Sequence, residues 1–155
     1  MQKYLLLLFI SVGLGISGCK QLTLDEQWDL DRQLIDDYVV ENGLEDGMYT
    51  DAGTYYLITE PGTSNQKPTV DSEVAVTYRG TLLNGKEFDA SGSRIISFGL
   101  WQVIEGWRDG MQQFTKGSTG ILIIPSALGY GNQKVGKIKK NSVLVFEIEL
   151  IDIFN

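Results

Sequence analysis

The sequence of 155 residues predicts an α+β protein, in which a twisted antiparallel β-sheet wraps around one short helix and a helical extension precedes the sheet. Three observations lead to this fold class. Apolar residues recur at helical spacing between residues 25 and 42, apolar and polar residues alternate in short segments after residue 53, and one further helical pattern falls among those segments. Alternating segments have one apolar and one polar face, which is typical of antiparallel sheets.

The first 19 residues have the form of a bacterial lipoprotein signal peptide. Lys3 precedes an apolar run from Tyr4 to Ile16, and small residues separate this run from Cys19, the only cysteine. The run is too short for a stable membrane-spanning helix. The resemblance implies cleavage before Cys19 and acylation of its sulfur, with an accidental cysteine or an uncleaved anchor as the alternatives. We therefore expect a lipid-anchored, extracytoplasmic protein of the bacterial cell envelope.

Charge and composition exclude several classes of function. The chain has 13 basic and 20 acidic residues, and loss of residues 1–19 leaves 12 basic ones and a net charge of −8. Such a surface repels nucleic acid, and membrane attachment would depend on acyl chains rather than on charge. Because the chain has no histidine, the usual general base, the Ser-His and Cys-His pairs and soft metal sites are excluded. We expect no metal and no nucleic-acid partner.

Residues 20–70 form an N-terminal extension with a helix and the first strand. The segment Thr23-Leu24-Asp25-Glu26 has the form of a capping box, and Asn42-Gly43 provides a stop signal. Between them lies one apolar stripe, made of Trp28, Leu34, Ile35, Tyr38 and Val39. We favour docking of this helix on its own domain, because such large apolar anchors require burial. A spacer or dimerisation arm is the alternative.

The strands are predicted from alternating patterns and turn residues. A first strand covers residues 54–59, a second covers 74–82, and the hairpin signal Asn84-Gly85 follows it. Short strand pieces at 88–89 and 96–98 precede the helix 104–114, which places Trp107, Met111 and Phe114 on one face. Two more apolar strands, 121–124 and 143–153, complete the domain, which we assign to residues 71–155.

One motif resembles a nucleotide-binding P-loop but lacks features that a P-loop requires. The stretch from Gly80 to Glu87 fits the P-loop spacing G-x-x-x-x-G-K, but a glutamate stands where a magnesium-binding Ser or Thr is required. A strand also follows where a helix is needed. Its glycines are better explained by a hairpin turn and by a crowded strand position at Gly80.

The segment from Val103 to Trp107 is the most informative for function. Together with Phe88-Asp89 and Tyr130-Gly131 it spaces apolar and aromatic side chains around very few polar groups. This composition is typical of a pocket for an uncharged, ring-shaped side chain.

Seven motifs in one order carry a family resemblance. They are Val76-x-Tyr78-x-Gly80-x-Leu82, Gly85-Lys86-x-Phe88-Asp89, Val103-Ile104-x-Gly106-Trp107, Gly117, Ile124-Pro125, Tyr130-Gly131 and Leu144-x-Phe146-x-Ile148-x-Leu150. This order resembles the FKBP-type peptidyl-prolyl cis-trans isomerases over residues 71–154, and residues 20–60 look like the extension of secreted members. The resemblance implies an FKBP-like sheet of five or six strands, with a substrate proline bound between sheet and helix.

The resemblance also implies which side chains bind the proline. Trp107 would form the floor of the pocket, Ile96 stands at a position that is usually aromatic, and Ile138 lies on the loop before the last strand. The walls would be formed by Tyr78, Phe88, Val103, Ile104 and Phe146. Taken singly, these aromatic residues could be ordinary core residues. In register with Tyr130 and Asp89, they favour a pocket.

Two polar residues would act at this pocket. Tyr130 would donate its hydroxyl to a substrate carbonyl, the backbone N–H of Ile104 would hold a second carbonyl, and Asp89 would orient its neighbours at the rim without taking a proton. Arg94 lies near the place of a basic partner for that aspartate. The segment 132–140 departs from the family, because it is short and has Ile138-Lys139-Lys140 where many members have Ile-Pro-Pro.

The expected function is peptidyl-prolyl cis-trans isomerisation during the folding of extracytoplasmic proteins. Rotation about an X–Pro bond breaks no covalent bond and has a barrier of roughly 18–20 kcal/mol, so it needs no nucleophile and no cofactor. The partners implied are proline-containing unfolded or partly folded polypeptides, macrolide inhibitors, and the membrane through the lipid on Cys19. The alternatives are a chaperone or binding module of the same fold with little isomerase activity, and a structural envelope subunit that recruits a partner through the helix 25–42.

Overall fold

The structure of the chain, a computed structural model, describes residues 22–154, so the predicted signal peptide and Cys19 lie outside it. The strands are β1 (Met48–Tyr49), β2 (Tyr55–Glu60), β3 (Glu73–Leu82), β4 (Glu87–Ala90), β5 (Ile96–Gly99), β6 (Thr119–Ile124) and β7 (Leu144–Phe154). The helices are α1 (Leu24–Glu41), α2 (Glu105–Gly110) and the short 3₁₀ turns η1 (Leu100–Gln102), η2 (Met111–Gln113) and η3 (Ser126–Leu128). The predicted α+β class is confirmed.

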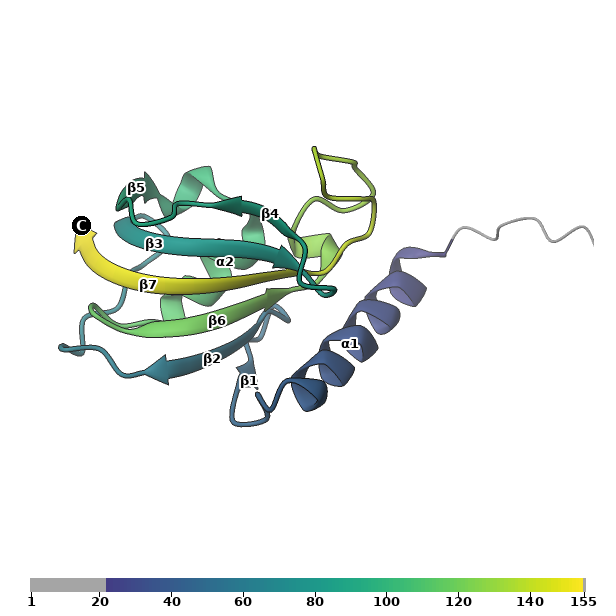
Figure 1. The fold of residues 1–155 in the computed structure, drawn as a ribbon, viewed down its shortest axis with the longest axis horizontal. Coiled ribbons are helices and arrows are strands. Elements are labelled where there is room, and N and C mark those ends of the chain that lie inside the picture. Colours follow the sequence, from purple (N-terminus) through teal and green to yellow (C-terminus); the bar gives the residue numbers. More distant parts are fainter. Residues whose placement is uncertain (1–21, 155) are drawn as a thin grey trace, which may run out of the picture.

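All strands belong to one antiparallel sheet with α2 on one of its faces (Figure 1). The strand order is β1-β2-β6-β7-β3-β4, and β5 pairs with the first half of β3, on the edge that β4 occupies further along. The sheet therefore has seven strands among the described residues, whereas the resemblance implied five or six. The two-residue strand β1 and the division of one edge between β4 and β5 account for the larger number.

Helix α1 begins at the predicted capping box. The N–H of Glu26 donates to the hydroxyl of Thr23 at 3.2 Å, and the N–H of Thr23 donates to the Glu26 carboxylate at 2.8 Å. Both bonds satisfy N–H groups that lack partners in the first turn of a helix. The helix ends at Glu41, and Asn42 closes it with a backbone bond to Tyr38. Within residues 22–154 there is no helix with the length and apolar character to cross a membrane.

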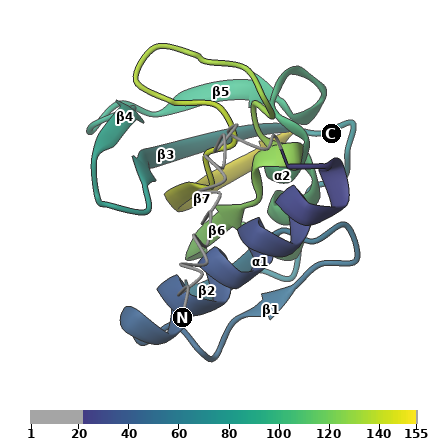
Figure 2. The same ribbon diagram turned by 90° about the vertical axis from the view of Figure 1, so that its right-hand side faces the viewer.

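Helix α1 docks on its own domain, as we favoured (Figure 2). Ile35 and Val39 are buried in a hydrophobic cluster that the sheet completes with Tyr55, Ile123, Val143 and Val145. The predicted stripe was partly wrong, since Leu34 is 37% exposed. Its place toward the domain is taken by the carboxylate of Asp31, which is fully buried. Residues 31, 35 and 39 are four positions apart and therefore share the face of the helix that meets the sheet.

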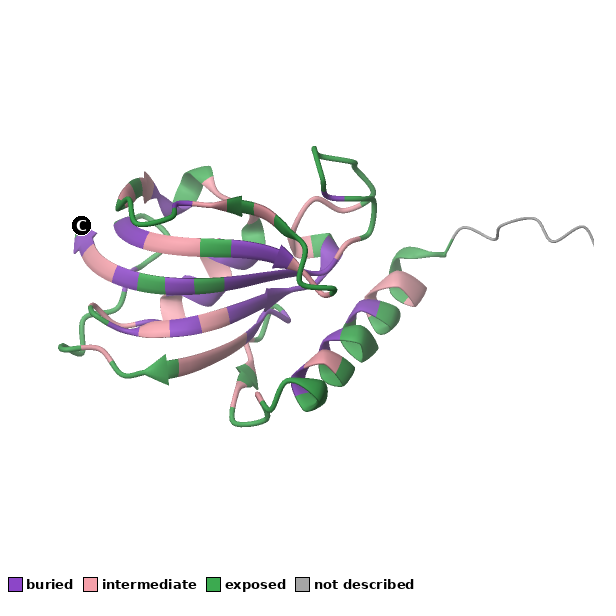
Figure 3. Cartoon of the chain, in the orientation of Figure 1, coloured by how far each residue is buried: buried purple, intermediate pink, exposed green. Residues whose placement is uncertain are grey.

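Buried and more exposed residues alternate along much of strand β7 (Figure 3), which separates two hydrophobic cores. Its residues Leu144, Phe146, Ile148 and Leu150 point into the larger core with α2, as predicted. Val145 points to the opposite face, where α1 covers it, whereas Glu147 and Glu149 on that same face are exposed. The uncovered part of the sheet therefore carries charged residues, and the covered part carries apolar ones.

Helix α2 lies close to β6 because of two glycines. A Cβ atom on Gly106 would lie 2.3 Å from Ile124, and one on Gly110 would lie 2.6 Å from Leu122. The helix is shorter than the predicted 104–114, because its last turn tightens into η2, where the N–H of Phe114 bonds to Met111. This turn leaves Phe114 fully buried against the sheet.

Candidate functional site

A cavity of about 630 Å³ opens beside α2, next to the loop that connects η3 to β7. Most of the residues predicted to bind or act on substrate line it. They are Tyr78, Phe88, Asp89, Val103, Ile104, Trp107, Tyr130, Ile138 and Phe146. These residues come from distant parts of the chain, and the antiparallel sheet brings them together. The volume is that of a site for a small organic group or a side chain.

Aromatic rings meet edge to face around Trp107, which is 4% exposed. The ring centre of Trp107 lies 5.2 Å from Phe146, 5.6 Å from Tyr78 and 5.4 Å from Phe98. Such pairs prefer this T-shaped geometry, because the positive edge of one ring faces the negative face of the other. The rings therefore brace one another in the apolar wall of the cavity.

Gly80 makes room for two of these rings. A Cβ atom at this position would lie 2.7 Å from the ring of Phe88 and 3.0 Å from that of Phe146. The centres of these two rings are 5.5 Å apart in a T-shaped pair. The crowded strand position predicted for Gly80 is confirmed, and its cause is the packing of the cavity wall.

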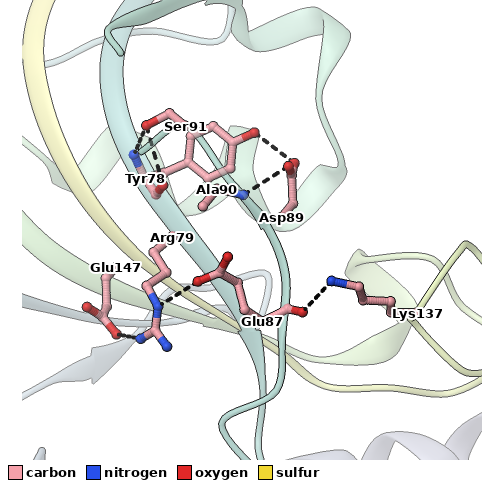
Figure 4. Close-up of polar contacts among 8 residues, drawn as sticks. All are labelled: Tyr78, Arg79, Glu87, Asp89, Ala90, Ser91, Lys137 and Glu147. Carbon is pink, nitrogen blue, oxygen red and sulfur yellow. Dashed lines mark hydrogen bonds and ion pairs between the residues drawn. The ribbon is translucent and has the colours of Figure 1, made fainter. Parts of the chain in front are cut away.

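The polar group at the rim is a hydrogen-bonded tyrosine and carboxylate pair (Figure 4). The Tyr78 hydroxyl donates to Asp89 at 2.7 Å, and the other carboxylate oxygen accepts the N–H of Ala90 at 2.9 Å. Burial, together with this hydrogen bond and the carboxylate charge, raises the pKa of Tyr78 to about 12. The carboxylate is thus held in one orientation, with its oxygens engaged within the protein.

Tyr130 lies on a tightly bonded turn at the cavity. The carbonyl of Ser126 accepts the N–H groups of both Gly129 and Gly131, and the carbonyl of Gly131 accepts the N–H of Asn141. Within residues 22–154 the Tyr130 hydroxyl has no hydrogen-bond acceptor in the protein. A fixed backbone with a free hydroxyl at a cavity is the arrangement of a donor that awaits a ligand.

The backbone N–H of Ile104 is a second free donor. Ile104 lines the cavity just before α2, and its carbonyl accepts the N–H groups of Trp107 and Arg108. Its own N–H has no acceptor in the described part of the chain. The cavity therefore offers two donors and an apolar wall to a ligand that carries carbonyl groups.

Ile96 is the one predicted substrate-binding residue that does not line the cavity. Phe98, two positions further on the same strand, lines it instead. Ile96 pairs with Val76, and Phe98 pairs with Val74. The aromatic residue of the cavity wall therefore lies two residues after Ile96 on β5. Because residues two apart on a strand share a face, the alternation of β5 marks both Ile96 and Phe98 as candidates and does not choose between them. Gln102 also lines the cavity and was not predicted.

The loop before β7 closes one side of the cavity. Val135 and Ile138 form two backbone hydrogen bonds with each other, at 3.0 and 2.8 Å, and Ile138 is 4% exposed. Val135, Gly136 and Lys137 line the cavity beside it. The ammonium group of Lys137 donates to the carbonyl of Glu87 at 3.2 Å, which ties the loop to β4 (Figure 4).

A second hollow, on the outer face of the sheet, has a different character. Its arginine pairs with two of its three glutamates, since Arg79 contacts Glu87 at 3.1 Å and Glu147 at 3.0 Å. Residues 22–154 contain no cluster of three or more side chains of the kinds that hold metal ions. The aromatic cavity is therefore the candidate site.

Comparison with known proteins agrees with this geometry. The family model for the FKBP-type peptidyl-prolyl cis-trans isomerases matches residues 64–151. Similar curated proteins include the FKBP-type isomerase FkpA of Buchnera aphidicola from Schizaphis graminum, 43% identical over 68% of this chain, and FkpA of Escherichia coli K12, 42% identical over 70%. The matches span 43% and 41% of those two relatives, so the chain covers less than half of their length.

Solved structures show the same fold. The crystal structure of FkpA from Escherichia coli matches 84% of this chain and 60% of its own chain, with a TM-score of 0.72 and 34% identity. A peptidyl-prolyl cis-trans isomerase from Pseudomonas syringae matches 87% of this chain and 98% of its own, with a TM-score of 0.73 and 31% identity.

Proposed function

The chain belongs to the FKBP-type peptidyl-prolyl cis-trans isomerase family, and on this premise we propose that it catalyses rotation about X–Pro peptide bonds in polypeptides. One observation carries the proposal above the others. The cavity combines a braced aromatic wall around Trp107 with two free donors, the Tyr130 hydroxyl and the Ile104 N–H.

The chemistry needs no more than such a cavity. In the planar ground state the X–Pro amide is dipolar through resonance, whereas the twisted transition state has lost that resonance. A dry aromatic site therefore disfavours the ground state more than the transition state. Each difference of about 1.4 kcal/mol raises the rate tenfold.

We assign roles to the residues accordingly. The pyrrolidine ring would rest on Trp107, between Tyr78, Phe146 and the other wall residues. Tyr130 and the N–H of Ile104 would bind carbonyl groups on either side of the proline. Asp89 would keep the Tyr78 hydroxyl engaged at the rim and would transfer no proton. Support comes from the 2.7 Å bond between these two side chains and from the apolar surroundings.

A peptide assay tests the proposal. The cis/trans interconversion of a tetrapeptide with a central proline is followed by NMR exchange, with and without the protein. We expect acceleration by the wild type and a large loss in Trp107→Leu, with Trp101→Leu as a control because that indole is 57% exposed and does not line the cavity. An interconversion rate that the wild type leaves unchanged would refute isomerase activity.

A double variant at the rim of the cavity separates catalysis from simple binding of unfolded chains. If the protein is a chaperone or binding module, the wild type and the double variant Tyr130→Phe with Asp89→Ala should suppress aggregation of a refolding client equally well. An isomerase that acts through these groups would lose acceleration of proline-limited refolding in that variant.

We further propose that the protein works outside the cytoplasm, held to a membrane by a lipid on Cys19. The support is the signal-like sequence of residues 1–19. Labelling of cells with a radioactive fatty acid should mark the wild type, and Cys19→Ser should lose the label and leave the membrane fraction. A label that persists in Cys19→Ser would refute this anchor.

A further inference from the structure

The loop beside the cavity carries an unusual concentration of positive charge. Residues 126–146 contain four lysines and no acidic residue. The rest of the chain has nine basic and 20 acidic residues, a net charge of −11. The lysines are Lys134, Lys137, Lys139 and Lys140, and all four are exposed.

These ammonium groups are not used in ion pairs of the described structure. The other pairs of the molecule engage residues such as Arg79 and Lys116, which contact Glu147 and Asp152. Of the loop lysines, Lys137 alone donates a side-chain hydrogen bond within residues 22–154, and its acceptor is a neutral carbonyl. Their charges therefore remain available to a partner.

The turn that carries these charges lies beside the cavity, where Lys137 is one of the lining residues. Two backbone bonds close the turn between Val135 and Ile138, and Lys134 and Lys139 flank this turn. The buried side chain of Ile138 and the bond from Asn141 to Gly131 fix the turn to the domain. A polypeptide whose proline occupies the cavity must therefore pass beside lysines.

We propose that the lysine loop, residues 134–140, selects polypeptide clients with acidic side chains near the proline. The inference rests on the proposed function and names its substrate class. Rim charges of this kind act mainly on the association rate and are screened by salt, with a Debye length of about 10 Å at 0.1 M. A polypeptide is favoured over an anionic bilayer as the partner, because Lys137 lines the cavity and the other three lysines lie within three residues of it in sequence.

The test compares three tetrapeptides that differ only beside the proline, with Glu, Gln or Lys there. We expect kcat/KM for the Glu peptide to exceed that for the Lys peptide about fivefold at low ionic strength and to converge with it at high salt. The double variant Lys134→Gln with Lys139→Gln should lose most of this preference and turn over the Gln peptide as the wild type does.

A matched control removes two charges elsewhere. Lys67→Gln with Lys116→Gln changes the net charge equally, at the end of β6 opposite to the loop, and Lys67→Gln alone is included because Lys116→Gln also removes the ion pair with Asp152. Equal rates for the three peptides, or equal loss of preference in both double variants, would overturn the proposal. The Gln peptide separates this failure from that of the proposed function, because its turnover depends on isomerase activity alone.

Binding provides a readout that does not depend on turnover. Anisotropy of fluorescently labelled peptides should show the same order, Glu above Gln above Lys, with the preference lost in the loop variant. If instead the loop lysines govern sedimentation with phosphatidylglycerol vesicles and no peptide preference exists, the loop binds a bilayer surface and the proposal is wrong.

Discussion

The Asp31 carboxylate of α1 accepts the backbone N–H of Ser126 at 2.7 Å, across 95 positions of sequence. Its other oxygen accepts the side-chain amide of Gln27 at 2.7 Å. Ser126 begins the turn that carries Tyr130, and its carbonyl accepts the N–H groups of Gly129 and Gly131, on either side of that tyrosine. A residue of the N-terminal extension thus contacts the backbone that carries a candidate catalytic hydroxyl.

We expect Asp31→Ala to lower the free energy of unfolding by about 1–3 kcal/mol, because it leaves a buried N–H without an acceptor. Isomerase activity should fall as well, since the turn that carries Tyr130 loses an anchor. Urea denaturation and the peptide assay measure the two effects. Asp29→Ala is the control, because Asp29 is exposed on the same helix. Equal stability of the two variants would contradict this prediction.

The Tyr130 hydroxyl can be tested against a second tyrosine. Tyr130→Phe should lower kcat/KM about tenfold, through one lost hydrogen bond in the transition state, and leave the unfolding free energy almost unchanged. Tyr55→Phe should do the opposite and cost about 1 kcal/mol of stability, because its buried hydroxyl donates to the carbonyl of Leu44. Loss of stability in Tyr130→Phe would show that its hydroxyl has a structural partner.

The pair of Tyr78 and Asp89 makes stability depend on alkaline pH. The pKa of Tyr78 is raised to about 12 in the folded protein, against about 10 in an unfolded chain. Folding therefore favours the protonated hydroxyl, and its contribution is complete below pH 10 and lost as the pH rises toward 12.

We expect the difference in unfolding free energy between the wild type and Tyr78→Phe to shrink over this window. Guanidinium denaturation at several pH values between 8 and 12 measures it. Using the difference cancels the titration of the other tyrosines. A difference that stays constant up to pH 12 would argue against the hydrogen bond to Asp89.

Gly80 is expected to tolerate no side chain. In Gly80→Ala the new methyl group would lie 2.7 Å from the Phe88 ring, so this ring must move toward the cavity. Overpacking of this kind costs about 1–3 kcal/mol, and peptide affinity should fall with it. Thr77→Ala on the same strand, whose hydroxyl contacts Glu149 at the surface, should change stability by about 0.5 kcal/mol or less. Normal peptide affinity in Gly80→Ala would contradict the packing role.

Much of the fold could be predicted, because local sequence patterns indicate most of its helices, strands and turns. The capping box at Thr23, the hairpin at Asn84-Gly85 and the alternation of β7 each depend on neighbouring residues only. Strand β1 was missed, since two residues show no periodicity. The buried Asp31 was missed because an acidic residue on a helix is ordinarily solvated, and its partner Ser126 is remote in sequence.

The candidate site was predictable as a set of residues and less so in its detail. The motifs gave the residues around Trp107, but the choice between Ile96 and Phe98 depends on how β5 aligns with β3. That alignment is a pairing between two strands, which the pattern of either strand alone does not specify. The lysines of the loop could be read from sequence, whereas their place at the cavity required the turn between Val135 and Ile138.

Strand β7 gives its two faces to two different cores, and one of these depends on Ile35, Val39 and Tyr55, which precede the family match at residue 64. Thr54 of the same segment also bonds to the carbonyl of Gly106 in α2. The boundary of the family homology is therefore not the boundary of the cooperative folding unit. A recombinant fragment cut at residue 64 should aggregate or melt early, and one that starts at residue 22 should not.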